Sequence, residues 1–179
     1  MAQTETSLLT VEEFAQIPDP PGGRYELHHG ECVLVPPPVI EHAYIGRQLW
    51  RMLDRICVGW YVDKEFAFRP MPEYEVWVAD VGMITEQRRR ATQQRGWLSG
   101  SPDLVAEVLS PSNTAQEIND RRQTCFQGGC KEFWVLDPKP KTIEVSTPDG
   151  QARTYTVNDE IPLDRFAPGK LSVAEVFAE

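Results

Sequence analysis

The sequence predicts an α/β fold, built on a mixed β-sheet with antiparallel additions. The segment from Leu104 to Leu136 has the order strand, helix, strand, which is typical of a right-handed crossover between parallel strands. Hairpin-like pairs of apolar runs near both ends of the chain supply antiparallel strands. With 179 residues, 41% of them hydrophobic and 25% charged, the chain suits one globular domain over residues 1–179.

The first third of the chain predicts a short helix, a hairpin and a long helix. Thr10 and Glu13 fit a capping box, so a helix should begin here and run to about Ile17. Two apolar-rich runs around His29-Gly30 predict a hairpin. From residue 40 to 57 the apolar residues recur at helical spacing, and this is the longest predicted helix.

The middle of the chain predicts strands followed by a polar connection. Two extended runs, Trp60 to Phe68 and Val76 to Ile84, are joined by a turn-like segment. The stretch TEQRRRATQQRGWLSG has no clear period, so we expect a mobile connection there. The run Leu104 to Leu109 then has the composition of a strand that is buried on both faces.

The remaining segments complete the predicted order. Ser112, Asn113 or Thr114 can cap a helix that Gly128-Gly129 closes. The strand EFWVLD follows at residues 132–137, and a second hairpin turns at residues 148–150. Ser172 begins a short terminal helix by another capping box.

Composition excludes several classes of protein. No stretch approaches the roughly 20 apolar residues of a membrane span, and the start MAQTETSLLT lacks the segments of a secretory signal, so we expect a soluble, cytoplasmic protein. The four cysteines have no CxxC spacing, which argues against a structural zinc site. A formal charge of −9 argues against broad coating of nucleic acid, but a local basic patch or an acidic metal pocket stays open.

Two acids lie inside apolar strands: Asp80 in VWVADVGMI and Glu107 in DLVAEVLS. A buried carboxylate without a partner is costly or becomes neutral. If the two strands are neighbours, the carboxylates converge, and such a pair needs a shared proton or a cation. Mg²⁺ is the natural counter-ion for oxygen ligands, and a site of this kind suits phosphodiester hydrolysis.

Other interpretations of the two acids stay open. Each can pair with an arginine, or its strand can turn one face to water. The two can also act as an acid and a base without metal, as in inverting glycosidases. Glu26 in YELHHG adds a third carboxylate, and His42 adds a candidate base or ligand, although a His near a helix N-terminus is more often a surface residue.

Five segments together resemble a known family. They are RYELHHGECVLVPPP, EHAYIGRQL, VADVGMI, PDLVAEVLSPSN and GGCKEFWVLDP. The set is similar to the Uma-type "putative restriction endonuclease" family, a branch of the PD-(D/E)xK nuclease superfamily. The resemblance covers the chain from about Thr10 to Ile143.

The resemblance implies a restriction-endonuclease-like core, a central mixed sheet flanked by helices, with a divalent-metal site at the edge of the sheet. It implies Asp80 and Glu107 as ligands of Mg²⁺ or Mn²⁺. Glu26 matches the acid of the family's YEL segment, and His42 matches its histidine at the start of the long helix. The implied partner is nucleic acid, namely DNA, and a nuclease that cuts both strands is often a homodimer.

The chain departs from the family at the motif lysine. Members of this branch carry that lysine on the helix after the second acid, and Leu109 occupies the position usual in other branches. The helix position is 121, where this chain has Arg121. An arginine can stabilise phosphorane-like charge but hardly accepts a proton from water. Arg121 can also be an ordinary exposed arginine that pairs with Glu117, four residues earlier.

Two hypotheses about function follow. The first is a metal-dependent endonuclease that hydrolyses phosphodiester bonds of DNA, with Arg121 steadying the scissile phosphate. The second is a weakened or inactive nuclease-fold protein that binds nucleic acid or a protein partner. The run Arg88-Arg89-Arg90, with Arg95 and Trp97, can contact phosphate and stack on a base, or it can be a solvated loop.

Overall fold

The computed structural model describes residues 8–92, 96–111 and 113–178. In these residues seven strands form one mixed sheet. In the described part, two pairs of neighbouring strands are parallel. One of these pairs is joined through α4 (Ala115–Gln127), and this connection is the predicted crossover. The α/β class and the mixed sheet are therefore confirmed. The strands, in spatial order, are β5 (Leu98–Ser99), β3 (Trp60–Arg69), β4 (Trp77–Thr85), β6 (Leu104–Val108), β7 (Glu132–Asp137), β8 (Thr142–Ser146) and β9 (Ala152–Tyr155).

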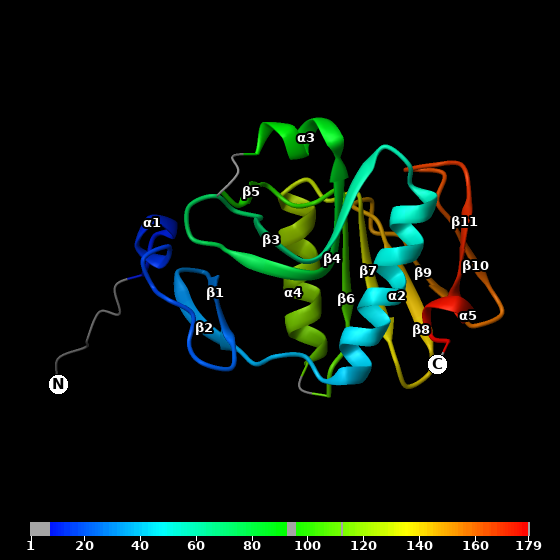
Figure 1. Cartoon of the computed structure of the whole chain (residues 1–179), viewed down its shortest axis with the longest axis horizontal. Coiled ribbons are helices and arrows are strands. Elements are labelled where there is room, and N and C mark those ends of the chain that lie inside the picture. The colour runs from blue at the N-terminus through cyan, green and yellow to red at the C-terminus, as the bar shows by residue number, and fades with distance from the viewer. Residues whose placement is uncertain (1–7, 93–95, 112, 179) are drawn as a thin grey trace.

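Helices cover both faces of the sheet. Figure 1 shows α2 (Ile40–Ile56) in front of the sheet and α4 behind it. The central strands contribute buried residues to both sides: Val81 and Ala106 pack in the core under α2, and Ala79 and Val105 pack in the core under α4. The central strands are thus buried on both faces, which is why β6 is a continuous apolar run broken only by its acid.

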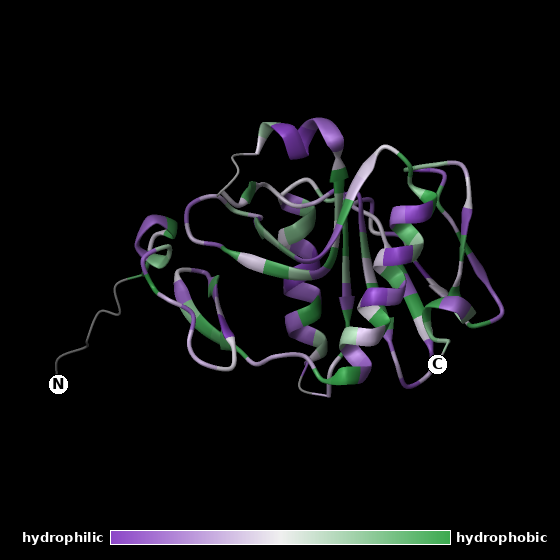
Figure 2. Ribbon diagram, in the orientation of Figure 1, coloured by the Kyte–Doolittle hydropathy of each residue, from purple (hydrophilic) through white to green (hydrophobic). Residues whose placement is uncertain are grey.

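The long helix α2 forms as its apolar spacing predicts. Ile45, Leu49, Met52 and Leu53 recur at helical spacing and are all buried against the sheet. Figure 2 shows the resulting alternation of hydrophilic and hydrophobic residues along this helix. The first residues of the helix lie beside the lower end of β4 and β6, and this position matters for the candidate site.

The N-terminal hairpin lies beside the main sheet. Strands β1 (Arg24–His28) and β2 (Glu31–Val35) pair antiparallel around a turn in which His29 has φ 51° and Gly30 has φ 79°. Positive φ at both central residues is the tight turn that matches strand twist. A backbone bridge between Leu27 and Val76 joins this hairpin to the segment that enters β4.

Capping residues begin three of the helices where the sequence predicts. Thr10 caps α1 (Val11–Phe14) with a complete capping box, although the helix ends before the predicted Ile17. Of the three candidates for the cap of α4, Thr114 is the N-cap, and its capping box with Glu117 is complete. Ser112 lies outside the described residues. Ser172 begins α5 (Val173–Val176) by accepting a hydrogen bond from the backbone of Glu175.

Two features differ from the sequence-based expectation. The polar stretch after β4 is not wholly a loose connection, because α3 (Glu86–Ala91) forms there with Thr85 as its cap. Its arginines bind acids of the same chain: Arg88 binds Asp103 of the segment before β6, and both following arginines bind Glu86. Near the C-terminus, β10 (Glu160–Pro162) pairs with β11 (Lys170–Ser172), a ribbon that no sequence pattern indicated.

No described helix is long and apolar enough to cross a membrane.

Candidate active site

The two acids of the central strands lie near each other. Strands β4 and β6 pair antiparallel, and the last residues of this pairing are Val81 and Ala106. Asp80 immediately precedes Val81 and Glu107 immediately follows Ala106, so both acids lie just beyond the last pair. The negative charge of Asp80 helps to raise the pKa of Glu107, so the two carboxylates are close enough to interact.

Asp80 is held by a backbone amide and a histidine. Its Oδ2 accepts a hydrogen bond of 2.7 Å from the backbone N–H of Val108 and lies 3.1 Å from Nε2 of His42. His42 is in the first turn of α2, which reaches the end of the sheet here. Burial lowers the pKa of His42, but the hydrogen bond and negative charge of Asp80 outweigh it, so the pKa is raised.

Glu107 is held by Arg121 of α4. The Nε of Arg121 donates to Oε1 of Glu107 over 2.7 Å. Burial raises the pKa of Glu107, the guanidinium of Arg121 opposes that rise, and the negative charge of Asp80 adds to it, so the pKa is raised to about 7. The partner that the buried glutamate requires is thus an arginine, one of the alternatives that the sequence left open.

Each of the three guanidinium nitrogens of Arg121 donates a hydrogen bond to the protein. Besides Nε, Nη2 donates to the carbonyl of Val78 over 2.6 Å, and Nη1 lies 3.4 Å from Oε2 of Glu26. The guanidinium also lies over the indole of Trp77, 5.0 Å from the ring centroid. The alternative of an exposed arginine paired with Glu117 is wrong, because Arg121 points into the acidic cluster and the carboxylate of Glu117 binds the backbone of the helix cap.

Glu26 joins the cluster from the hairpin. It is 2% exposed, and its carboxylate contacts Arg24 at 3.2 Å and His28 at 3.0 Å in addition to Arg121. Burial raises the pKa of Glu26, but the hydrogen bond from His28 and the charges of Arg121 and Arg24 outweigh it and lower the pKa to about 2. Glu26 is therefore ionised at neutral pH.

Sequence reasoning missed Arg24 and His28. A usable signal existed, because alternate residues of a strand point to one face, and the sequence R-Y-E-L-H puts both of them on the face of Glu26. It also missed Trp77, which contacts both the ring of His28, at a centroid distance of 5.3 Å, and the guanidinium of Arg121.

The arginines of α3 form their ion pairs with Asp103 and Glu86, not with the acids of this cluster. Arg88 donates to Asp103 and to the carbonyl of Ser101, so it ties α3 to the segment before β6. Trp97 packs against Phe14 of α1, with ring centroids 5.9 Å apart. Arg95 lies outside the described residues.

The donor set fits a divalent ion held by two carboxylates. No group of three or more His, Cys, Asp or Glu side chains in the described part of the chain is arranged to hold a metal ion. Mg²⁺, however, is commonly bound by one or two carboxylates with water and substrate phosphate completing its shell. The hydrogen bonds above engage one oxygen of each acid, and Oδ1 of Asp80 and Oε2 of Glu107 are the oxygens that would serve as ligands.

The mixed sheet with helices on both faces is a restriction-endonuclease-like core, and the acids of β4 and β6 lie within it. The chain belongs to the Uma2 family, whose model is described as "Putative restriction endonuclease" and matches residues 11–175. The family resemblance seen in the sequence motifs is thereby confirmed.

A solved structure shares the fold. It is the crystal structure of "a putative nuclease belonging to DUF820" from Anabaena variabilis, with a TM-score of 0.80 and 20% sequence identity over 95% of this chain and 98% of that one. At this identity the likeness shows the fold alone. No curated protein matches the chain.

Proposed function

We propose that this protein is a metal-dependent endonuclease that hydrolyses phosphodiester bonds of DNA. Membership of a family described as restriction endonucleases supports nuclease function in general. The observation that supports metal dependence is the pair of carboxylates, Asp80 and Glu107, which lie in adjacent strands close enough to interact. The repulsion that helps to raise the pKa of Glu107 is what a cation between the two would relieve.

Each residue of the cluster has a role in this proposal. Asp80 and Glu107 would hold Mg²⁺ or Mn²⁺, which supplies positive charge to the phosphate and favours ionisation of water. His42 orients the carboxylate of Asp80, and Glu26 orients Arg121. Arg121 keeps positive charge beside the reacting phosphate, but it is a poor proton acceptor.

A cleavage assay tests this function. Supercoiled plasmid, linear duplex, single-stranded DNA and RNA are incubated with the protein in Mg²⁺, in Mn²⁺ and in chelator. We expect nicking or cutting that requires the metal and is lost in Asp80→Ala. The matched control is Asp137→Ala, an acid at the end of the neighbouring strand β7 whose side chain binds a turn amide. If the wild-type protein cuts none of these substrates in either metal, the proposal is wrong.

The lysine exchange is tested in the same assay. Arg121→Lys restores the family residue and can accept a proton, so cleavage should rise if proton transfer limits the rate. Unchanged cleavage would mean that Arg121 contributes only charge. Because the lysine cannot make all three hydrogen bonds of the guanidinium, the folded fraction of this variant is measured beside the rate.

A second function has a specific observation in its favour. Each nitrogen of Arg121 donates one hydrogen bond, to Glu107, Glu26 or Val78, so the protein occupies three of the five N–H donors of the guanidinium. A site closed in this way suits a weakened or inactive nuclease-fold protein that binds nucleic acid or a protein partner. Binding that survives in chelator, with no cleavage in any metal, would favour this alternative.

The proposed function also has consequences for domain organisation and oligomeric state. We propose that the chain works as one domain, and that cutting of both strands of a duplex uses a two-fold homodimer, since that symmetry matches the substrate. Sedimentation of the protein alone and with a duplex measures the stoichiometry directly.

A further inference from the structure

The outward face of α2 carries a row of arginines. Arg47, Arg51 and Arg55 are four residues apart, so each is rotated only about 40° from the one before it and rises about 6 Å along the helix axis. All three are exposed, opposite the buried residues that pack on the sheet. The row is therefore a linear arrangement of cations on one surface.

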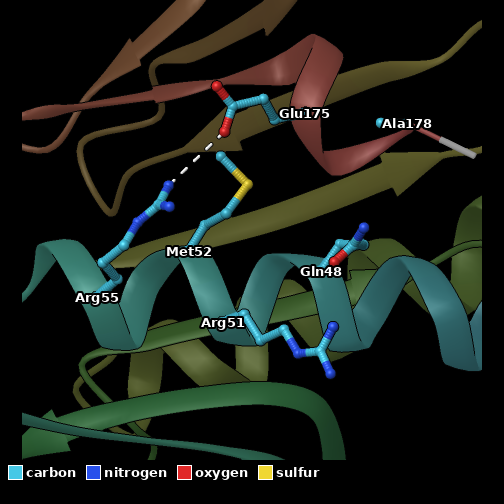
Figure 3. Close-up of a pocket in the computed structure, with 6 residues that line it drawn as sticks. All are labelled: Gln48, Arg51, Met52, Arg55, Glu175 and Ala178. Atoms are coloured by element: carbon cyan, nitrogen blue, oxygen red, sulfur yellow. Dashed lines mark ion pairs between the residues drawn. The ribbon is translucent and has the colours of Figure 1, made fainter.

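Two of these arginines differ from most cations of the chain. More than half of its lysines and arginines form ion pairs with acids in the described residues. Arg47 and Arg51 have neither an ion pair nor a side-chain hydrogen bond with any described residue. Figure 3 shows the contrast on one helix: Arg55 reaches toward Glu175 of α5, at 3.7 Å, while Arg51 turns away from it.

The row begins at the end of α2 that bears the candidate site. His42, whose ring contacts Asp80, lies five residues before Arg47. Between the end of the helix and the arginines, the same outward face presents Ile40, 90% exposed, and Tyr44, 40% exposed. An aromatic ring beside regularly spaced cations is the composition of surfaces that track a nucleic-acid strand.

We propose that Arg47 and Arg51 contact neighbouring phosphates of a nucleic-acid backbone and lead that backbone to the site at the start of α2. The inference rests on the proposed nuclease function and names the surface that binds its substrate. Phosphate contacts position a protein on nucleic acid without reading its sequence. In a chain with a net charge of −9, binding should depend on these few local cations rather than on the charge of the whole molecule.

A binding titration in chelator tests the proposal without requiring cleavage. The probes are a fluorescein-labelled DNA duplex and its single strand, titrated with wild type, Arg47→Ala, Arg51→Ala and the double variant at several salt concentrations. Each lost phosphate contact should reduce the slope of log affinity against log salt by about 1. At 0.1 M salt this slope corresponds to roughly eightfold weaker binding for each arginine.

The matched control is the double variant Lys139→Ala and Arg153→Ala. Both residues are exposed at the β7–β8 connection and on β9, and the control loses the same net charge. Alanine at exposed helix positions favours the helix, so the α2 variants should keep the wild-type melting temperature.

The outcomes separate this proposal from the proposed function. Wild-type binding that is unchanged in the α2 double variant, or equally reduced in the control, overturns the role of this face and leaves the nuclease proposal intact. Loss of binding in the α2 variants alone supports the proposal, even if no substrate is ever cut. Polyglutamate is titrated as a third probe. If Arg47→Ala and Arg51→Ala weaken its binding as much as they weaken DNA binding, the face fits an acidic protein and the proposal is overturned. A wild type that binds neither probe overturns the role of this face, and the cleavage assay in Mg²⁺ and Mn²⁺ decides the nuclease proposal separately.

Discussion

Replacing Arg121 by methionine should destabilise the fold by an amount that depends on pH. The side chain is 16% exposed, and its guanidinium forms ion pairs with Glu107 and Glu26, whose side chains are 11% and 3% exposed. Methionine has a similar length and keeps an apolar contact with Trp77, but it removes the positive charge and the hydrogen bond to the carbonyl of Val78.

The magnitude follows from Glu107, which loses the arginine that pairs with it, whereas Glu26 keeps Arg24 and His28. Removing one partner of a buried ion pair costs about 3 to 5 kcal/mol, because the remaining charge has lost its compensation. We therefore expect the free energy of unfolding at pH 8 to fall by about 3 to 5 kcal/mol.

The loss should be smaller at pH 5. The pKa of Glu107 in the folded protein is raised to about 7, above its ordinary value of 4.5, and it rises further once Arg121 is gone. Between the unfolded and folded values, the folded state binds more protons than the unfolded state, so stability falls as the pH rises. A rise of the pKa from about 7 to well above 8 adds up to about 1.4 kcal/mol to the difference between pH 5 and pH 8, because Glu107 is then protonated at both pH values.

Urea unfolding followed by tryptophan fluorescence at pH 5 and pH 8 measures both quantities. Arg122→Met is the matched control, because the adjacent arginine pairs with the more exposed Glu144. The control should lose less than about 1 kcal/mol, as expected for a pair open to water, with little change between the two pH values. A loss below about 1 kcal/mol for Arg121→Met at pH 8, or an equal loss at both pH values, would refute the account of a buried charge bridge.

Three further substitutions test the packing around the site. Gly82→Ala would place a methyl group 2.6 to 2.8 Å from side-chain atoms of Phe66, so thermal unfolding should show a loss of about 1 to 3 kcal/mol, and an unchanged melting temperature would contradict this contact. Thr114→Ala removes the cap of α4 and should cost about 1 kcal/mol in urea, whereas Thr114→Ser should cost much less. Arg88→Met leaves Asp103 with a single cationic partner and should cost about 1 to 3 kcal/mol; faster amide exchange in α3 should accompany it, and wild-type exchange rates would argue against the tether.

Much of the fold is predictable from local patterns. The strand–helix–strand unit, the hairpins and α2 follow from strong periodicity and from caps such as Thr114, which act over a few residues. The helix α3 escapes this reasoning because it buries no apolar residue and is held by Arg88, whose partner Asp103 lies 15 residues away. The three-residue strands β10 and β11 are too short to show a period.

Some residues of the candidate site are likewise predictable from local patterns, whereas their contacts are not. Asp80 and Glu107 are visible in the sequence because an acid inside an apolar strand demands a partner. Which partner it obtains depends on tertiary contacts. The local rule favours an Arg121–Glu117 pair, whereas the folded chain offers Arg121 a deeper pair with Glu107 at 2.7 Å. Whether these residues bind metal and cut nucleic acid stays a prediction.

The bridge between Glu26 and Glu107 has a consequence for how sequences of this family can diverge. The guanidinium of Arg121 joins the hairpin to the central sheet, so a substitution at position 26, 107 or 121 changes the ion pairs of the residues at the other positions. A lysine at position 121 would leave Glu26 with fewer donors, and Arg24 and His28 are the residues that supply donors to it here. We therefore expect relatives with lysine at position 121 to differ from this chain at positions 24 and 28 as well, as one inherited set.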